Sequence, residues 1–324
     1  MQKDILSKEE SLALYRKLIL TRLAEEKIRE EYFKDEMKTP VHLGIGGEAI
    51  PVGVCHCLPP RSKTFGTYRN HSLYLAMTED TDGFFGELYG KVNGPGKGKA
   101  GSMHLSFPER DFIATSAVVG TTIPVAVGAA LANAYRKSND VVTVFFGDGA
   151  VEEGVFWESL NFACLKNLRV LFVCEDNGLA IHTPAKERQG FQSILETVKT
   201  FDCYVGGGQG HDLQGVIQST HQVVKQMEDQ PKPGFLHFTY YRFLEHVGPR
   251  EDFDAGYRSR PTPDNLDGLD PVLCFERDLC QNGCKPSELS AIKKSVEEKI
   301  AKSVLTAQKT DFPSSEELYT DLFV

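Results

Sequence analysis

Two apolar runs, each followed at once by a polar turn, constrain this chain more than any other feature. Val141–Phe146 precedes Gly147-Asp148-Gly149-Ala150, and Arg169–Cys174 precedes Glu175-Asp176-Asn177-Gly178. Both runs have the length and composition of buried strands, and Glu152–Lys166 between them suits a crossover helix. The second polar turn follows the first at about the spacing of a βαβ unit. We therefore predict an α/β fold with a mainly parallel sheet flanked by helices.

The polar turns predict a site for Mg²⁺ and a diphosphate. Open parallel sheets place their ligands at the carboxyl ends of neighbouring strands, where Asp148 and Asn177 are expected to meet. Mg²⁺ prefers a few protein oxygens together with water and phosphate. The backbone N–H groups of Gly149 and Ala150 are candidates for the phosphates at the helix start. A lone Gly-Asp-Gly is more often an ordinary turn, and it is the spacing to Asn177 that favours a functional site.

Composition and charge exclude several classes of protein. The chain has 324 residues, 41% of them hydrophobic, which is enough for one large α/β core. Its formal net charge of −9 argues against a nucleic-acid partner, because phosphate contacts normally come from a basic face. No stretch has the length and apolar character of a membrane span.

The N-terminal sequence and the cysteines predict a cytoplasmic protein. Met1–Ser7 shows neither the apolar core of a secretion signal nor an Arg-rich import leader. Eight cysteines without a CxxC motif are typical of reduced thiols, and we assign them no metal and no disulfide.

Both ends of the chain are predicted to be helical. Ser7 and Glu10 form a capping-box pattern before an amphipathic segment that runs towards Tyr32. Near the other end, Pro286 opens a segment whose apolar residues recur every three or four positions. We therefore divide a single domain, 1–324, into an N-terminal helical arm (1–40), a cofactor-binding core (41–260) and a C-terminal helical segment (261–324).

Glycine-rich stretches raise the alternative of a nucleotide site. Gly94–Gly98 and Gly206–Gly210 are rich in glycine, yet neither gives G-x-G-x-x-G between an evident strand and helix, and the chain has no P-loop motif. NAD and ATP binding are therefore disfavoured. Lys91–Ser102 is predicted to be a loop across the mouth of the site, with lysines that either attract an anion or are simply solvated.

Several motifs together give a resemblance that spans nearly the whole chain. Gly-Asp-Gly followed by Asn at this interval resembles the thiamine diphosphate signature. Further landmarks are His42–Ala49, Thr67–His71, Gly98–His104, Ala117–Gly120 and Tyr241–His246. In this order they resemble the alpha subunits of the first component of 2-oxo-acid dehydrogenase complexes, which use pyruvate, acetoin or branched-chain substrates. The resemblance implies the thiamine diphosphate-binding fold with helical extensions at both ends.

The resemblance also implies roles for individual residues. It assigns Mg²⁺ to the Asp148 carboxylate, the Asn177 amide oxygen and the Leu179 carbonyl. Residues matching positions that meet the diphosphate, the aminopyrimidine or the reacting centre are Tyr68, Arg69, Ala117, Val119, Gly149, Ala150, Arg242 and His246. Proton transfers near neutral pH suit imidazoles, so His246 and His42 are the first catalytic candidates. His71 and His104 are weaker candidates, for orienting the others. Outside the family context, each of these residues is more often structural.

The implied activity needs a second chain. Family members receive a catalytic glutamate from a separate beta subunit, most simply in an α₂β₂ assembly, and pass the acyl unit to a lipoyl-bearing acyltransferase. The implied reaction is decarboxylation of a 2-oxo acid or cleavage of acetoin. Two alternatives stay open: a thiamine-dependent carboligase that transfers the unit to an aldehyde or ketone, and a non-catalytic regulatory subunit.

Two departures from the family pattern concern the segment around His246. Leu244-Glu245 stands where pyruvate-type members usually have His-Gly. Glu245 would repel a phosphate or a substrate carboxylate unless it is paired with Arg242, with Arg250 or with a differently charged substrate. Val247 replaces a serine that is commonly phosphorylated in animal pyruvate enzymes, and valine has no hydroxyl to modify.

Overall fold

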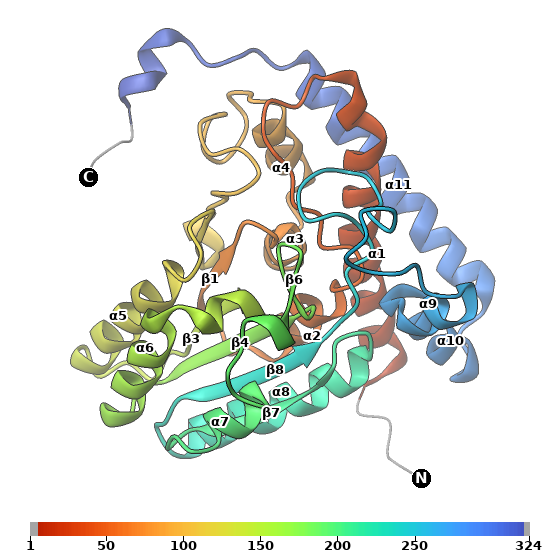
Figure 1. Cartoon of the computed structure of the whole chain (residues 1–324). Helices are drawn as coiled ribbons and strands as arrows, with labels where there is room; N and C mark the ends of the chain where they lie inside the picture. The colour runs from red at the N-terminus through yellow and green to blue at the C-terminus, as the bar shows by residue number, and fades with distance from the viewer. Residues whose placement is uncertain (1–5, 321–324) are drawn as a thin grey trace.

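A six-stranded parallel sheet forms the centre of the molecule (Figure 1). The computed structural model describes residues 6–320, so residues 1–5 of the segment considered above as a leader lie outside it. The strand order is β2-β1-β3-β4-β8-β7, and every pairing within this sheet is parallel. The strands are β1 (Lys63–Thr67), β2 (Phe112–Ser116), β3 (Val142–Gly147), β4 (Val170–Asp176), β7 (Tyr204–Gln209) and β8 (Gly234–Thr239). The short strands β5 (Leu179–Ala180) and β6 (Thr183–Pro184) pair separately and antiparallel.

Helices cover both faces of the sheet. They are α1 (Lys8–Glu31), α2 (Ala49–Cys57), α3 (His71–Thr78), α4 (Thr81–Leu88), α5 (Thr122–Tyr135), α6 (Gly154–Leu165), α7 (Ile194–Val198), α8 (Leu213–Asp229), α9 (Pro263–Leu269), α10 (Pro271–Gln281) and α11 (Pro286–Lys309). Short 3₁₀ turns include η3 (Asp148–Glu152), η4 (Ala185–Glu187) and η5 (Ser315–Tyr319). Within residues 6–320, none of these helices has a stretch both long and apolar enough for a membrane span. The predicted α/β class is confirmed.

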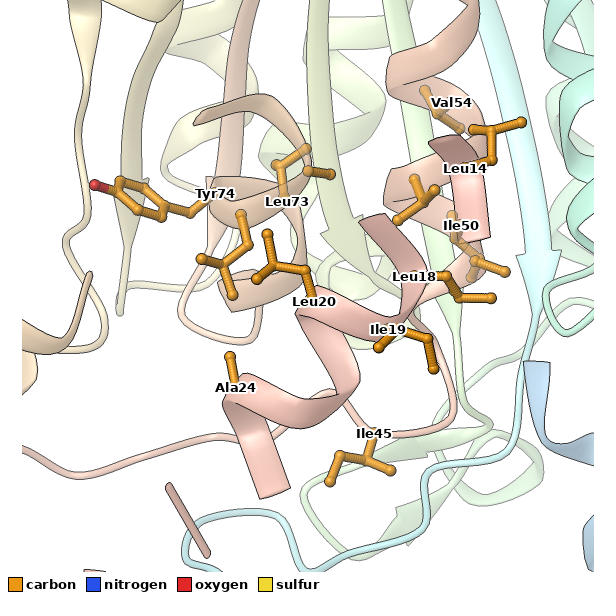
Figure 2. Packing of buried hydrophobic residues seen from close by; sticks show 14 of the residues in the cluster. Leu14, Leu18, Ile19, Leu20, Ala24, Ile45, Ile50, Val54, Leu73 and Tyr74 are labelled. Carbon is orange, nitrogen blue, oxygen red and sulfur yellow. The ribbon is translucent and has the colours of Figure 1, made fainter. Parts of the chain in front are cut away.

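The two faces of the sheet bury separate hydrophobic clusters. Residues of α5, α6 and α7 pack with Val144 and Phe172 on one face. On the other, α1, α2, α3 and α8 pack with Phe145 and Val173. Figure 2 shows part of this second cluster, in which Leu14, Leu18 and Ile19 of α1 lie among residues of α2 and α3. Because β3 and β4 are buried on both faces, their sequences are largely apolar and do not alternate, with Thr143 and the polar end of β4 as exceptions.

The predicted βαβ unit is present with small differences in its boundaries. The first strand, the crossover helix and the second strand correspond to β3, α6 and β4. The helix begins at Gly154, two residues later than predicted, because Asp148–Glu152 first form the 3₁₀ turn η3. The polar turn after β3 therefore contributes its N–H groups from η3 and not from the first turn of α6.

The terminal helices pack into the same cluster as the helices of the core. Ser7 and Glu10 form the predicted capping box at the start of α1. Helix α11 buries Leu289, Val296 and Ile300. Figure 1 shows α1 and α11 side by side, and both contribute to the larger cluster. Their apolar residues therefore stabilise the face of the sheet that carries α2 and α8.

The glycine-rich loop after α4 wraps around one carboxylate. Glu87 is 1% exposed. Its Oε2 accepts hydrogen bonds from the backbone N–H groups of Gly96 and Gly98 at 2.7 and 3.2 Å, and its Oε1 accepts from those of Ala100 and Gly101 at 2.7 and 3.0 Å. Glycine at position 94 permits this close approach, since a Cβ there would lie 2.4 Å from the same carboxylate. The loop thus binds an internal anion.

Candidate functional site

A cavity of about 280 Å³ opens at the carboxyl ends of β1, β2, β3 and β4. Its walls are formed by Thr67, Tyr68, Arg69, Ser116, Val119, Gly120, Gly147, Asp148, Gly149, Ala150, Glu152, Glu153, Glu175, Asn177, Leu179, Ala180, Ile181, Tyr240 and His246. The predicted site residues Tyr68, Arg69, Val119, Asp148, Gly149, Ala150, Asn177, Leu179 and His246 are among them. Residues 91–102 do not line this cavity, so the predicted loop is present but not at the mouth of the site.

Register brings the two polar turns together. Gly147 at the end of β3 pairs with Glu175 near the end of β4, so the residues that follow each strand meet. The backbone N–H of Asn177 points to Asp148 Oδ1 at 3.4 Å. The Asn177 amide is held in turn by the N–H of Leu179, which donates to Oδ1 at 3.1 Å, and by Tyr240 Oη, 3.2 Å from Nδ2. The predicted meeting of Asp148 and Asn177 is confirmed.

Asp148 is a buried anion that opens on the cavity. It is 1% exposed, and burial together with the nearby charge of Asp176 raises the pKa of its carboxyl group. Its described counter-charge is the guanidinium of Arg188, which contacts Oδ2 and also Oε1 of Glu152. A carboxylate in this environment is a strong binding group for a cation.

The oxygens at this point fit a Mg²⁺ ion bound together with a phosphate ligand. Among residues 6–320 there is no cluster of three or more His, Cys, Asp or Glu suited to a metal. The available donors are one carboxylate, one amide oxygen and a nearby backbone carbonyl at Leu179. Mg²⁺ accepts such a set when water and phosphate complete its octahedron.

A second group of polar side chains adjoins the cavity. It comprises His246, Arg69, Tyr68 and His42. An Arg69 Nη2 hydrogen bond reaches His246 Nδ1 at 3.0 Å, and the same nitrogen donates to the His246 carbonyl at 2.9 Å. Since a guanidinium only donates, Nδ1 must accept, and the ring proton is placed on Nε2. Burial, followed by the charges of Arg69 and Arg242, lowers the pKa of His246 to about 4. His246 is therefore a neutral hydrogen-bond donor at pH 7.

His42 lies behind His246 without lining the cavity. Its ring is 5.2 Å from that of His246 and 4.4 Å from that of Tyr68, centroid to centroid. It is 9% exposed, and its buried Nδ1 has no hydrogen-bond partner in the described structure. Burial, then the charge of Arg69, lowers the pKa of His42 to about 3. His42 thus contacts two residues of the cavity wall, Tyr68 and His246, without lining the cavity itself.

Five predicted residues do not line the cavity: His42, His71, His104, Ala117 and Arg242. His71 is fully buried, where Nδ1 meets Glu25 Oε1 at 3.0 Å and Nε2 meets Ser102 Oγ at 2.8 Å. Ala117 also lies off the wall, which Ser116, Val119 and Gly120 form in its place. Both ring nitrogens of His71 are thus used within the protein, which favours a structural role, and its catalytic role stays a prediction.

Arg242 does not face the ligand space either. It is 1% exposed, with Nε donating to the carbonyl of Leu244 at 2.9 Å and Nη2 donating to Tyr257 Oη at 2.9 Å. Nη1 donates to the carbonyl of Ile181 at 3.3 Å, which places the guanidinium behind the cavity wall. These acceptors engage all three nitrogens of the guanidinium, and its contact with a diphosphate stays a prediction.

Glu245 is accommodated by a local turn. Its Oε1 accepts a hydrogen bond from the backbone N–H of Arg250 at 2.8 Å, and its own N–H donates to the Arg250 carbonyl at 2.9 Å. Of the partners considered for Glu245, Arg250 contacts it through the main chain. Glu245 does not line the cavity.

Sequence reasoning missed Glu175 and Arg188. Glu175 lines the cavity, and its Oε2 accepts a hydrogen bond from Asn70 Nδ2 at 2.7 Å, which ties β4 to the residues after β1. Burial raises the pKa of Glu175 to about 7, opposed by Asn70 and Arg69. Its place beside Asp176 and Asn177 was a usable signal. No local pattern marked Arg188, which lies 40 residues beyond Asp148.

Comparison with known proteins gives one consistent family. The sequence profile of the dehydrogenase E1 component matches residues 15–316. The chain is 31% identical to the alpha subunit of acetoin:2,6-dichlorophenolindophenol oxidoreductase from Bacillus subtilis, over 98% of this chain and 95% of that protein.

Pyruvate-type relatives are similar to the same degree. Identity to the pyruvate dehydrogenase E1 component subunit alpha is 30% for the protein of Zymomonas mobilis and 31% for that of Rhizobium meliloti. These matches cover 98% of this chain and 89% and 91% of the two relatives. The profile covers nearly the whole chain, and the relatives align over 98% of it. The chain therefore belongs to the dehydrogenase E1 component family.

Proposed function

We propose that this chain is the alpha subunit of a thiamine diphosphate-dependent 2-oxo-acid dehydrogenase of the pyruvate or acetoin type. The observation that carries the proposal is the contact between Asp148 and Asn177 at the cavity, where a metal and a diphosphate fit. Family membership supports thiamine diphosphate as the cofactor. The names of the relatives support oxidation of pyruvate or acetoin.

Mg²⁺ would be held by Asp148, Asn177 and the Leu179 carbonyl. The space for the diphosphate is lined by Gly149 and Ala150. Arg69 adds a cation on the facing wall. When bound, thiamine diphosphate supplies a carbanion for attack on the ketone and accepts the electrons released with CO₂. The protein's own task is to position the reactants and to balance their charge.

The neutral His246 is the residue best placed to hold a proton at the reacting centre. Arg69 fixes the ring through Nδ1, and Nε2–H would then donate a hydrogen bond to a substrate oxygen that gains negative charge. His42 and Tyr68 pack against this ring and limit its rotation. Arg69 and His42 are therefore positioning residues for His246.

The cavity's rim supports a partner chain. Val119, Ile181 and Val247 are 45%, 56% and 47% exposed, and the first two line the cavity. Val118 beside them is 65% exposed. Apolar side chains gathered at the rim of a ligand cavity are typical of a protein interface. They favour a beta subunit over the site, in an α₂β₂ assembly that delivers the acyl unit to a lipoyl-bearing acyltransferase.

A cytoplasmic location is proposed from the chemistry of the cysteines. All eight are free thiols, which suits a reducing compartment. We also propose that the chain forms a single domain.

The test is calorimetric titration of thiamine diphosphate, with and without Mg²⁺, into this chain co-purified with its candidate beta subunit. We expect Mg²⁺-dependent binding, followed by reduction of lipoamide with pyruvate or acetoin as substrate. Acyloin formation without lipoamide reduction would replace the dehydrogenase by a carboligase. No binding by an assembled complex would leave a non-catalytic regulatory subunit.

A further inference from the structure

The carboxylate proposed to bind the metal already carries a cation of the protein's own. Arg188 follows the short turn η4 and reaches back so that Nη2 contacts Asp148 Oδ2. Its Nη1 contacts Glu152 Oε1, and its Nε donates to the carbonyl of Thr183 at 3.0 Å. The Arg188 side chain is 9% exposed, so this is a shielded ion pair.

A guanidinium and a divalent cation cannot share Asp148 without further negative charge. Mg²⁺ binds carboxylate oxygens at about 2.1 Å, which would bring it within about 4 Å of a guanidinium on the same carboxylate. Even at an effective dielectric constant of about 20, repulsion between such charges exceeds thermal energy several-fold. Glu152 and Asp176 are the other negative charges that act at this point, and a diphosphate adds several more at once.

Most of the segment that carries Arg188 lies outside the core, and Phe191, which packs against Trp157, is the described residue that anchors it there. None of residues 181–193 is fully buried. Arg188 itself is held by polar contacts to Asp148, Glu152 and Thr183. Segments with few buried apolar contacts open at low cost in free energy. The ion pair to Asp148 can therefore break while the one to Glu152 remains.

From these contacts we infer that Arg188 is a resident counter-ion of the metal site: it neutralises Asp148 in the ligand-free protein and yields that carboxylate to Mg²⁺ when a diphosphate arrives. Glu152 then keeps the released guanidinium at the edge of the site. This inference rests on the proposed cofactor function. It implies that Mg²⁺ alone binds weakly and that Mg²⁺ and a diphosphate bind cooperatively.

The experiment is calorimetric titration of the full-length chain with MgCl₂, in the absence and presence of inorganic pyrophosphate. In Arg188→Gln we expect Mg²⁺ alone to bind roughly tenfold tighter than in wild type, because the competing charge is gone. The cooperativity with pyrophosphate should fall by a comparable factor. Arg188→Lys, which keeps one charge without the planar fork, should lie between the two.

A matched control and a second readout separate this effect from damage to the fold. Arg61→Gln removes an arginine–aspartate pair at the surface, with Asp140, and should bind Mg²⁺ as wild type does. In thermal unfolding, Arg188→Gln should melt earlier than wild type without ligand and gain more from Mg²⁺. If Arg188→Gln unfolds before titration, tighter Mg²⁺ binding by Arg188→Lys carries the test.

The outcomes distinguish the inference from the proposed function. Equal or weaker binding of Mg²⁺ alone by the Arg188 variants, with normal binding in the presence of pyrophosphate, overturns the counter-ion role and leaves the metal site intact. Failure of wild type and variants alike to bind Mg²⁺ with pyrophosphate overturns both the site and the inference.

Discussion

Glu87 and Asp148 are both buried carboxylates, each 1% exposed, yet the groups that neutralise them differ. Glu87 accepts four backbone N–H groups from one loop, which cannot leave without unfolding that loop. Asp148 is paired with the side chain of Arg188 and borders a cavity. A carboxylate satisfied by the main chain is a structural centre, whereas one satisfied by a long side chain can exchange its partner for a ligand. The following experiments test that distinction.

The largest effect is expected at Glu87. In Glu87→Gln an NH₂ group would face backbone N–H groups that now donate to the carboxylate, so donors oppose donors. We expect a loss of about 3–4 kcal/mol in the free energy of unfolding, measured by urea denaturation. Glu109→Gln, at an exposed glutamate, is the control and should change stability by less than about 0.5 kcal/mol. A small loss at Glu87 would show that its loop is not a structural centre.

Asp148→Asn should affect binding more than folding. The amide keeps the shape of the side chain but removes the charge that attracts Mg²⁺. We expect the Mg²⁺-dependent affinity for thiamine diphosphate to fall roughly a hundredfold, or about 2.7 kcal/mol, in calorimetry of the complex with the beta subunit. Asp140→Asn, which alters a surface ion pair, should bind normally. Normal binding by Asp148→Asn would remove the metal from this carboxylate.

Replacing His246 tests its proposed role as a hydrogen-bond donor in the cavity, with the cofactor still bound. In His246→Gln we expect the affinity for thiamine diphosphate to stay within a few-fold of wild type. Turnover of the assembled enzyme should fall roughly a hundredfold, because the positioned Nε2–H is lost. His221→Gln, on the exposed side of α8, serves as the control. Unchanged turnover would take His246 out of the reaction.

The smallest effect is expected in the pH dependence of stability, through His42 beside the cavity. Burial lowers the pKa of His42 to about 3 in the folded chain, against an ordinary value of about 6.5 when unfolded. The unfolded state therefore binds the proton first, and the stability contributed above pH 6.5 is lost as the pH falls towards about 3. We expect wild type to lose up to about 1.4 kcal/mol per pH unit below pH 6.5 through this group. Urea curves for His42→Gln at pH 7 and pH 5.5 should lack that part of the slope, and parallel losses in both proteins would contradict it.

The sequence predicted the parts of the site that are local. The strands β3 and β4 and the turns after them could be found because burial on both faces makes a strand largely apolar and its end abruptly polar. Their contact then follows from the geometry of a parallel βαβ unit, without knowledge of the rest of the chain.

What could not be predicted depends on which side chains share an environment. Arg242 and His71 lie in motifs of the family, but their orientation is set by partners distant in the sequence, such as Tyr257 for Arg242 and Glu25 for His71. Arg188 shows the converse, since no motif marks it and only the folded chain brings it to Asp148. In the glycine-rich loop the backbone N–H groups donate to Glu87, whereas the ammonium groups of Lys97 and Lys99 contact Glu317.

The hydrogen-bonded row of Ser102, His71 and Glu25 has a consequence for how sites are recognised. Hydroxyl, imidazole and carboxylate stand in the order and at the separations of a hydrolase's nucleophilic triad. Ser102 is 1% exposed and the other two side chains are fully buried, so no ester or amide can approach the hydroxyl. The same three groups that would activate a nucleophile in a cleft here join α1, α3 and the segment before β2. Access to substrate, and not the constellation itself, separates an enzyme's machinery from the framework of its fold.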